Sequence, residues 1–329
     1  MTVRTAGALG IVYVVWGSTY LAIRYAVEDF PPLLSAALRF LTAALLLLGY
    51  LVLRRGRAAL RSTRTQTGTA ALSGVLLLAG GNGLVSIAEQ QVDSGLVALL
   101  IACTPLWIVV LRTLLRDRPA PATAVGVLIG LGGVALIFLP GGSGGTDVPY
   151  AALCVLAALS WSAGSLLVTL RPVPADPLML TTVEMAAGGA VLLVASVARG
   201  EPAGFSFGDV SGSSWLALAY LVVFGSLVAF TAYVWLLGNA PVSLVATYAY
   251  VNPAVAVLLG ALFAGERLTG SALAGGLVVL AAVALVVTAE SRRRRADRRA
   301  DAAAGPEVAG PEVAGPEVAG PAGARDRLS

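Results

Sequence analysis

The chain has 329 residues, of which 57% are hydrophobic and only 12% are charged, and its mean hydropathy is +0.85. Soluble domains carry roughly 25% charged residues, so this composition predicts a protein whose surroundings are mostly membrane lipid. All basic side chains behind the net charge of +4 are arginine and histidine is absent, which excludes a Walker A lysine, a Schiff-base lysine, a histidine-based triad and histidine metal sites.

Ten apolar runs are long enough to cross the roughly 30 Å hydrocarbon core of a bilayer. They lie near residues 7–27, 34–53, 70–88, 94–115, 122–139, 149–168, 181–198, 214–237, 242–264 and 270–288. The first run passes signal-peptide length without a small-residue cleavage site, so we expect it to be retained. The sequence therefore predicts an all-α membrane protein with ten transmembrane helices.

Arginines gather after the even-numbered runs: between residues 54 and 64, between 112 and 118, at 171, and between 292 and 299. The loops on the other side carry acidic residues, among them Glu28, Asp29 and Asp93. Arg24 and Glu28 are four residues apart, a spacing that favours an ion pair on a helix. Because cytoplasmic loops are enriched in arginine, we expect a multi-pass protein of the inner or plasma membrane with both termini in the cytoplasm. The positive charge does not indicate nucleic-acid binding.

The chain divides into two similar halves, residues 1–140 and 149–289. Trp16 and Trp161 open the halves, and Arg39 and Glu184 each follow 23 positions later. Five runs in each half place the second copy upside down in the membrane, an inverted repeat of the kind that alternating-access carriers use. Residues 290–329 hold a basic block and three Gly-Pro-Glu-Val-Ala repeats. We expect a disordered cytoplasmic tail there, with the basic block either lying on anionic lipid or serving only to orient the protein.

Span one contains Trp16-Gly-Ser-Thr-Tyr20. Gly17 beside Ser18 and Thr19 can loosen the helix and turn backbone groups toward a cavity, although both hydroxyls can equally bond back to the preceding turn. Trp161 and Ser165 occupy the equivalent place in span six. We expect both segments to line one central space.

Charged side chains inside a membrane cost about 2.5–3.5 kcal/mol on insertion scales and invite a functional interpretation. Arg39 in span two is a candidate fixed charge that anchors a substrate carboxylate or orients the outer gate. The alternative is a structural ion pair with Glu89, Glu28 or Asp29. Glu184 in span seven is a candidate coupling carboxylate, or else pairs with Arg171 or reaches the interface. Glu89, at the end of span three, is the second candidate coupling carboxylate.

Pro105 and Pro253 lie inside spans four and nine, where each removes a backbone hydrogen bond and kinks its helix. Paired kinks point to a binding site near the midplane between the halves, with Asn252 and Tyr248 beside the second. Glycines in spans five and ten allow close helix packing, within one chain or in a homodimer. The candidate cavity residues are Trp16, Ser18, Thr19, Tyr20, Arg39, Asn82, Trp161, Ser165, Tyr233, Tyr248 and Asn252.

The segments Trp16–Tyr20, Phe30–Pro32 and Ala37–Phe40, and later Pro253, Gly265–Leu268 and Gly275, resemble the EamA-type transporters of the drug/metabolite transporter superfamily. The resemblance covers about residues 7–289. It implies a ten-helix inner-membrane carrier with a central cavity, and export of amino acids, related metabolites or drug-like compounds. It also implies a mostly structural role for Glu266.

The sequence thus predicts a secondary transporter of a small-molecule substrate, embedded in membrane lipid and working by alternating access. We expect no enzyme activity, no metal and no cofactor. The alternative is an integral membrane receptor or structural protein that transports nothing. Such a protein would not need paired proline kinks and polar cavity residues in both halves.

Overall fold

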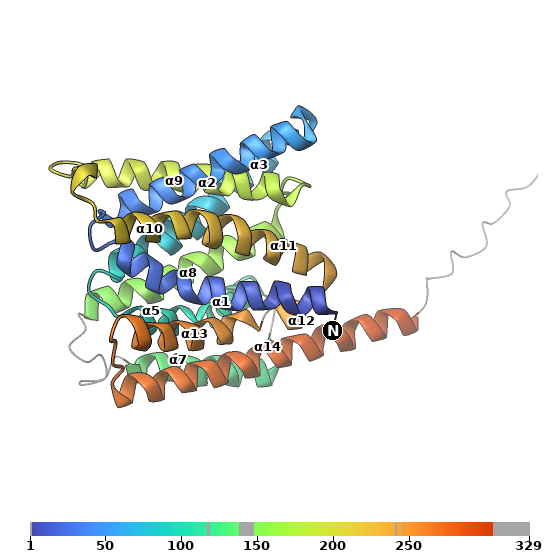
Figure 1. Ribbon diagram of the computed structural model, residues 1–329. Coiled ribbons are helices and arrows are strands. Elements are labelled where there is room, and N and C mark those ends of the chain that lie inside the picture. The colour runs from blue at the N-terminus through green and yellow to red at the C-terminus, as the bar shows by residue number, and fades with distance from the viewer. Residues whose placement is uncertain (1, 117–118, 138–147, 241, 246, 305–329) are drawn as a thin grey trace, which may run out of the picture. The chain divides into compact units, whose positions relative to one another are not determined.

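The computed structural model describes residues 2–116, 119–137, 148–240, 242–245 and 247–304, which form helices and their connecting turns (Figure 1). The helices of the first half are α1 Val3–Ala26, α2 Pro32–Arg55, α3 Arg64–Gly74, α4 Leu84–Ala88, α5 Ser94–Ile101, α6 Thr104–Leu114 and α7 Pro121–Ile137. Those of the second half are α8 Val148–Leu170, α9 Pro177–Ala198, α10 Gly212–Tyr220, α11 Ala229–Asn239, α12 Val242–Val245, α13 Tyr248–Phe263 and α14 Gly270–Ala304. Single 3-10 turns occupy Arg57–Leu60 and Phe207–Asp209.

Within the described residues, eight helical segments are long and apolar enough to cross a membrane. Helices α7 and α13 are also apolar but shorter, and they coincide with the fifth and ninth predicted spans. The structure therefore confirms an all-helical, multi-pass membrane protein. The described residues up to Ser291 form one compact unit, and a second unit begins at Arg292.

Two segments wind as π-helices, which the sequence analysis did not predict. The first π segment, Val75–Gly83, joins α3 to α4, and the second π segment, Leu221–Val228, joins α10 to α11. They occupy the third predicted span of each half. π-Helical turns inside longer helices are rare and frequently mark functional sites.

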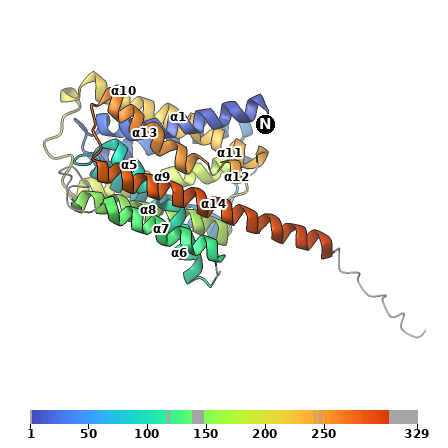
Figure 2. The ribbon, with the colours of Figure 1, turned by 90° about the horizontal axis from the view of Figure 1, so that it is seen from below.

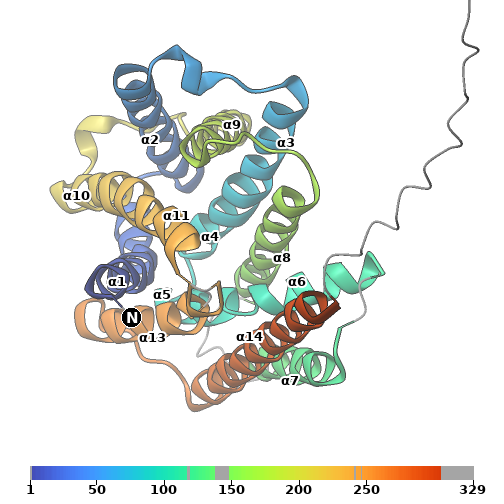
Figure 3. The same ribbon diagram turned by 90° about the vertical axis from the view of Figure 1, so that its right-hand side faces the viewer.

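Helices from the two halves pack against each other throughout the first unit (Figure 3). Helix α2 lies along α9, α1 lies along α13 and α11, and α8 contacts α6 and the first π segment. Helix α5 lies against α13. The central space is therefore enclosed by elements from both halves.

The glycine-rich helices α7 and α14 run side by side within one chain (Figure 2). A Cβ atom added at Gly133 would lie 3.0 Å from the Gly275 carbonyl oxygen, and one added at Gly275 would lie 2.8 Å from the Gly133 carbonyl oxygen. Only residues without side chains permit this approach. These glycine surfaces thus serve packing inside the chain.

Candidate functional site

A cavity of about 220 Å³ lies among α1, α2, α5, α6, α8, α9, α11, α13 and both π segments. Ligand pockets usually enclose about 300–1,000 Å³, so this cavity suits a small molecule. Most candidate residues line it: Trp16, Thr19, Tyr20, Arg39, Asn82, Pro105, Trp161, Ser165, Glu184, Tyr248, Asn252 and Pro253.

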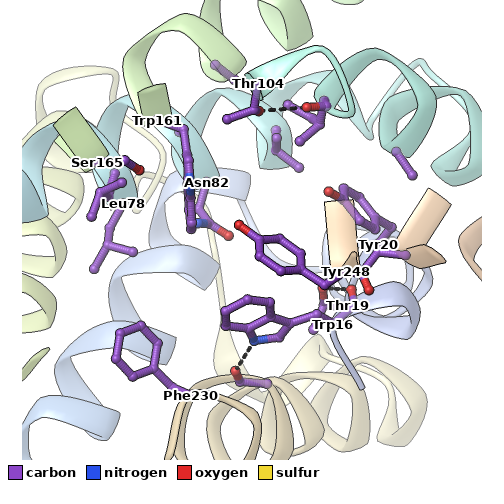
Figure 4. Close-up of a pocket in the computed structure, with 18 of the residues that line it drawn as sticks. Trp16, Thr19, Tyr20, Leu78, Asn82, Thr104, Trp161, Ser165, Phe230 and Tyr248 are labelled. Carbon is purple, nitrogen blue, oxygen red and sulfur yellow. Dashed lines mark hydrogen bonds between the residues drawn. The ribbon is translucent and has the colours of Figure 1, made fainter. Parts of the chain in front are cut away.

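Aromatic rings form one wall of the cavity (Figure 4). The Trp16 ring centroid lies 5.3 Å from that of Tyr248 and 6.4 Å from that of Phe230. Its indole Nε1 donates a hydrogen bond of 3.2 Å to the Gly225 carbonyl oxygen in the second π segment. This bond fixes the plane of the indole ring. Its acceptor is a carbonyl oxygen in a segment where α-helical hydrogen bonding gives way to π-helical hydrogen bonding.

Trp161 packs against the first π segment through a glycine. A Cβ atom added at Gly81 would lie only 2.8 Å from Trp161 Cε3, so the ring requires glycine there. The neighbouring Ser160 donates a hydrogen bond of 2.7 Å to the Leu76 carbonyl oxygen. Trp16 thus contacts the second π segment, and Trp161 contacts the first π segment. Each tryptophan is therefore held by a π segment of the other half.

Helix α1 runs unbroken through Trp16–Tyr20, so the loosening considered for Gly17 is absent. Ser18 and Thr19 bond back to the carbonyl oxygens of Val15 and Trp16 at 2.8 and 2.6 Å. Gly17 serves close packing, because a Cβ atom there would lie 2.6 Å from Val255 Cβ on α13. Thr19 still lines the cavity, whereas Ser18 faces the Tyr220 hydroxyl at 2.7 Å.

Arg39 is a buried cation with no carboxylate partner in the part of the chain that the structure describes. Its side chain is 7% exposed, its Nε donates a hydrogen bond of 3.1 Å to Ser226 Oγ, and its guanidinium carbon lies 4.8 Å from the Phe40 ring centroid. Among the described residues no acidic oxygen lies within 4.0 Å of it, so the ion pairs with Glu89, Glu28 or Asp29 are not formed. The charge is therefore left to face the cavity.

Glu184 brings a carboxylate to the same cavity. It is 6% exposed and accepts a hydrogen bond of 2.8 Å from Ser73 Oγ. The part of the chain that the structure describes contains no ion pair between Glu184 and Arg171. One wall thus carries a guanidinium group and another a carboxyl group, both shielded from bulk water.

The two prolines sit differently in their helices. Pro105 lies in the first turn of α6, after a break at Ala102 and Cys103, so its missing N–H costs no helical bond. Pro253 lies inside α13. Beside it, the side-chain oxygen of Asn252 is buried and accepts no hydrogen bond from any described residue.

Three candidate residues lie outside the cavity wall. Ser18 is turned toward Tyr220, Tyr233 packs behind Trp16 with ring centroids 5.1 Å apart, and Glu89 is buried at the end of α4. The wall also contains residues that the sequence analysis missed: Thr104, Thr181, Gly225, Ser226 and Phe230. Only the position of the second π segment would have indicated Gly225 and Ser226.

One end of the helical unit carries most of the acidic loop residues; we call it the acidic end, defined by Glu28, Asp29, Glu89, Asp93, Glu201 and Glu266. Glu266 accepts hydrogen bonds from the backbone nitrogens of Ser94 and Gly95 at 2.9 and 3.0 Å, which caps α5. Its role in this contact is structural.

Arg24 at the acidic end pairs with other acidic residues than the Glu28 expected from the sequence. It lies 3.1 Å from Asp93 and 3.5 Å from Glu266, and no ion pair with Glu28 forms among the described residues. Glu201 accepts a hydrogen bond of 3.0 Å from the Leu34 backbone nitrogen. The Arg24–Glu266 and Glu201–Leu34 contacts therefore join the two halves at this end.

Comparison with known proteins places these features in a family. The profile of the EamA-like transporter family matches residues 6–139 and again residues 148–288. The chain is 41% identical over 265 residues to the uncharacterized inner membrane transporter YedA of Escherichia coli K12, covering 80% of this chain and 84% of that protein. It is 26% identical to the uncharacterized transporter YvbV of Bacillus subtilis, covering 83% and 88%.

A solved crystal structure shares the fold, with a TM-score of 0.59 and 20% sequence identity over 89% of this chain and 99% of that one. The double profile match and the identity to YedA extend over most of the membrane-embedded chain. The chain belongs to the EamA-like transporter family.

Proposed function

We propose that this protein is a secondary carrier that exports amino acids or related small metabolites and drug-like compounds by alternating access. The observation that carries the proposal is the cavity between the two halves, in which Arg39 and Glu184 supply opposite charges among aromatic rings. A small zwitterion matches that combination of size and charge. Arg39 would bind its carboxylate, Glu184 its ammonium group, and Trp16 and Tyr248 would pack on the remainder.

The proposal includes two inverted five-helix repeats, residues 1–140 and 149–289, which together cross the membrane ten times. The two profile matches and the reciprocal packing of α1 with α11 and α8 with the first π segment support it. In this arrangement, rocking of one bundle against the other would expose the cavity to each side in turn.

From the arginine-rich ends of the helices and the positive-inside rule we infer that both termini and the tail lie in the cytoplasm. The acidic end then faces outward. Because Arg24, Asp93 and Glu266 join the halves at that end, the conformation described here would be closed to the outside. A substrate can drive the cycle only by binding the two conformations with different affinity.

Two measurements test this function. A growth-tolerance and export screen with overexpressed protein, run against amino acids and toxic analogues, should identify compounds that cells exclude. Counterflow of the identified compound into vesicles containing purified protein should then be faster than into empty vesicles. Absence of flux across the whole panel would favour the receptor or structural alternative, since such a protein needs no moving cavity.

A further inference from the structure

Glu89 is a buried acidic side chain that has no hydrogen-bond or ion-pair partner among the described residues. It lies at the C-terminal end of α4, at the acidic end, and is 3% exposed. Both carboxylate oxygens are inaccessible, and neither accepts a hydrogen bond from any residue that the structure describes. An ionised carboxylate in such a place loses its hydration without compensation, so the group is stable there only with its proton.

The other buried acid at this end has a different environment. Glu266 is 9% exposed, but its oxygens accept hydrogen bonds from Ser94 Oγ and from the Ser94 and Gly95 backbone nitrogens, and Arg24 lies nearby. Those three hydrogen bonds satisfy its carboxyl oxygens. Glu89 accepts no such hydrogen bond from any described residue.

The charged and titratable groups around Glu89 come from four elements: Tyr20 and Arg24 on α1, Arg39 on α2, Cys154 on α8, and Glu266 between α13 and α14. Neither arginine forms an ion pair with Glu89. Arg24 is held by Asp93 and Glu266, while Arg39 is held by Ser226. Separation of the halves at the acidic end would free Arg24 and admit water.

We propose that Glu89 is a proton-binding site that controls closure of the acidic end. With the end closed, the carboxyl group is neutral and buried; with the end open, water and Arg24 stabilise the carboxylate, and the proton passes to water. Closure then requires Glu89 to take a proton back, so acidification on that side favours the closed form. The link to transport rests on the proposed function, but the proton site itself does not.

Infrared difference spectroscopy during a pH titration of the purified protein tests the proton site directly. The closed wild-type protein should show the carbonyl stretch of a protonated carboxyl group. Glu89→Gln should remove that contribution, Glu89→Asp should shift it, and Glu28→Gln, at an exposed position of the same end, should leave it unchanged. A wild-type spectrum without the band, or a band that Glu89→Gln and Glu89→Asp leave unaltered, overturns the proposal.

Cysteine labelling tests the control of closure without a substrate. Ala26 is fully buried at the acidic end and Ser213 is exposed there, whereas the native Cys103 and Cys154 are buried. With an impermeant maleimide, the labelling of Ala26→Cys relative to Ser213→Cys should fall on acidification. Adding Glu89→Gln should hold the ratio low at every pH. An unchanged pH response in that variant contradicts the proposal, and both measurements remain valid if no transport is found.

Discussion

Arg39 donates its Nε hydrogen to Ser226 Oγ at 3.1 Å, joining α2 of the first half to the second π segment of the second half. The bond orients the guanidinium group without neutralising it, because serine carries no charge. A buried cation that is held in place and left unpaired is suited to bind an anionic group that arrives from the cavity.

Removing the charge at Arg39 should weaken binding of substrates that carry a carboxylate. A hydrogen bond to a charged group is worth about 1.5–3 kcal/mol, so Arg39→Ala should raise the apparent KM roughly 10- to 100-fold for such substrates. Counterflow with the compound found in the export screen measures this change. Arg54→Ala, which removes an exposed arginine from the same helix, is the matched control, and equal effects of the two substitutions would remove Arg39 from the site.

Ser226→Ala should keep the charge but release the orientation of Arg39. We expect a smaller loss of affinity than for Arg39→Ala, of about 1 kcal/mol or roughly fivefold. Ser226→Thr retains a hydroxyl group and should recover part of the affinity. A Ser226→Ala protein with wild-type KM would show that this bond does not position the cation.

Gly225 leaves room for Arg39 and Thr19 in the cavity wall. A Cβ atom there would lie 3.2 Å from Arg39 Nη2 and 3.1 Å from Thr19 Cγ2. Gly225→Ala should therefore push both side chains inward and reduce transport of larger substrates more than that of smaller ones. Gly212→Ala, where nothing lies within 4 Å of the added atom, should leave the ratio of the two rates unchanged.

Neighbouring glycines on α7 provide a stability test of the α7–α14 contact. A Cβ atom at Gly133 would lie 2.9 Å from Val278 Cγ1 and 3.0 Å from backbone atoms of α14, whereas one at Gly132 meets nothing within 4 Å. Gly133→Ala should destabilise the protein by about 1–3 kcal/mol and lower its Tm in detergent. Gly132→Ala should leave Tm equal or higher, since alanine favours the helix; the reverse order would contradict the packing described.

Asp29 should link stability to acidic pH. Hydrogen bonds from the side chain and backbone of Ser211, and then from Ser214, lower the pKa of Asp29. A carboxylate with a lowered native pKa stabilises the fold above its unfolded-state pKa, and this contribution is lost as the pH falls through the native value. The Tm difference between wild type and Asp29→Asn should therefore shrink on acidification, while Asp209→Asn gives the baseline. A constant difference would show that ionisation of Asp29 is not involved.

The sequence was sufficient for the helical membrane architecture and for a set of polar and aromatic residues from both halves that line part of the cavity wall. Apolar runs report membrane crossing directly, and the paired tryptophans and Arg39 mark matching places in the halves. The ninth predicted span, residues 242–264, is divided between α12 and the shorter α13, because a hydropathy pattern does not register where the backbone turns.

Long-range partners could not be predicted from local patterns. The bond from Arg39 to Ser226 joins residues 187 positions apart, and Glu266 caps a helix that begins 172 positions earlier. The π segments were also not predicted. Their i→i+5 hydrogen bonding depends on contacts with neighbouring helices, which a local sequence pattern does not contain. Helix α1 is a third example. Gly17 suggested a loosened helix, but α1 is unbroken there, and Gly17 instead allows close packing against Val255 on α13.

Accessibility of the cavity from both sides tests alternating access most directly. Ser165 lines the cavity, and Ser165→Cys is close to isosteric, so a cysteine there samples the proposed site. We predict that a small impermeant thiol reagent labels it from either face of sealed vesicles, and more slowly when the transported compound is bound. Labelling from one face only, under every substrate and pH condition, would contradict a carrier whose central cavity opens to each side in turn.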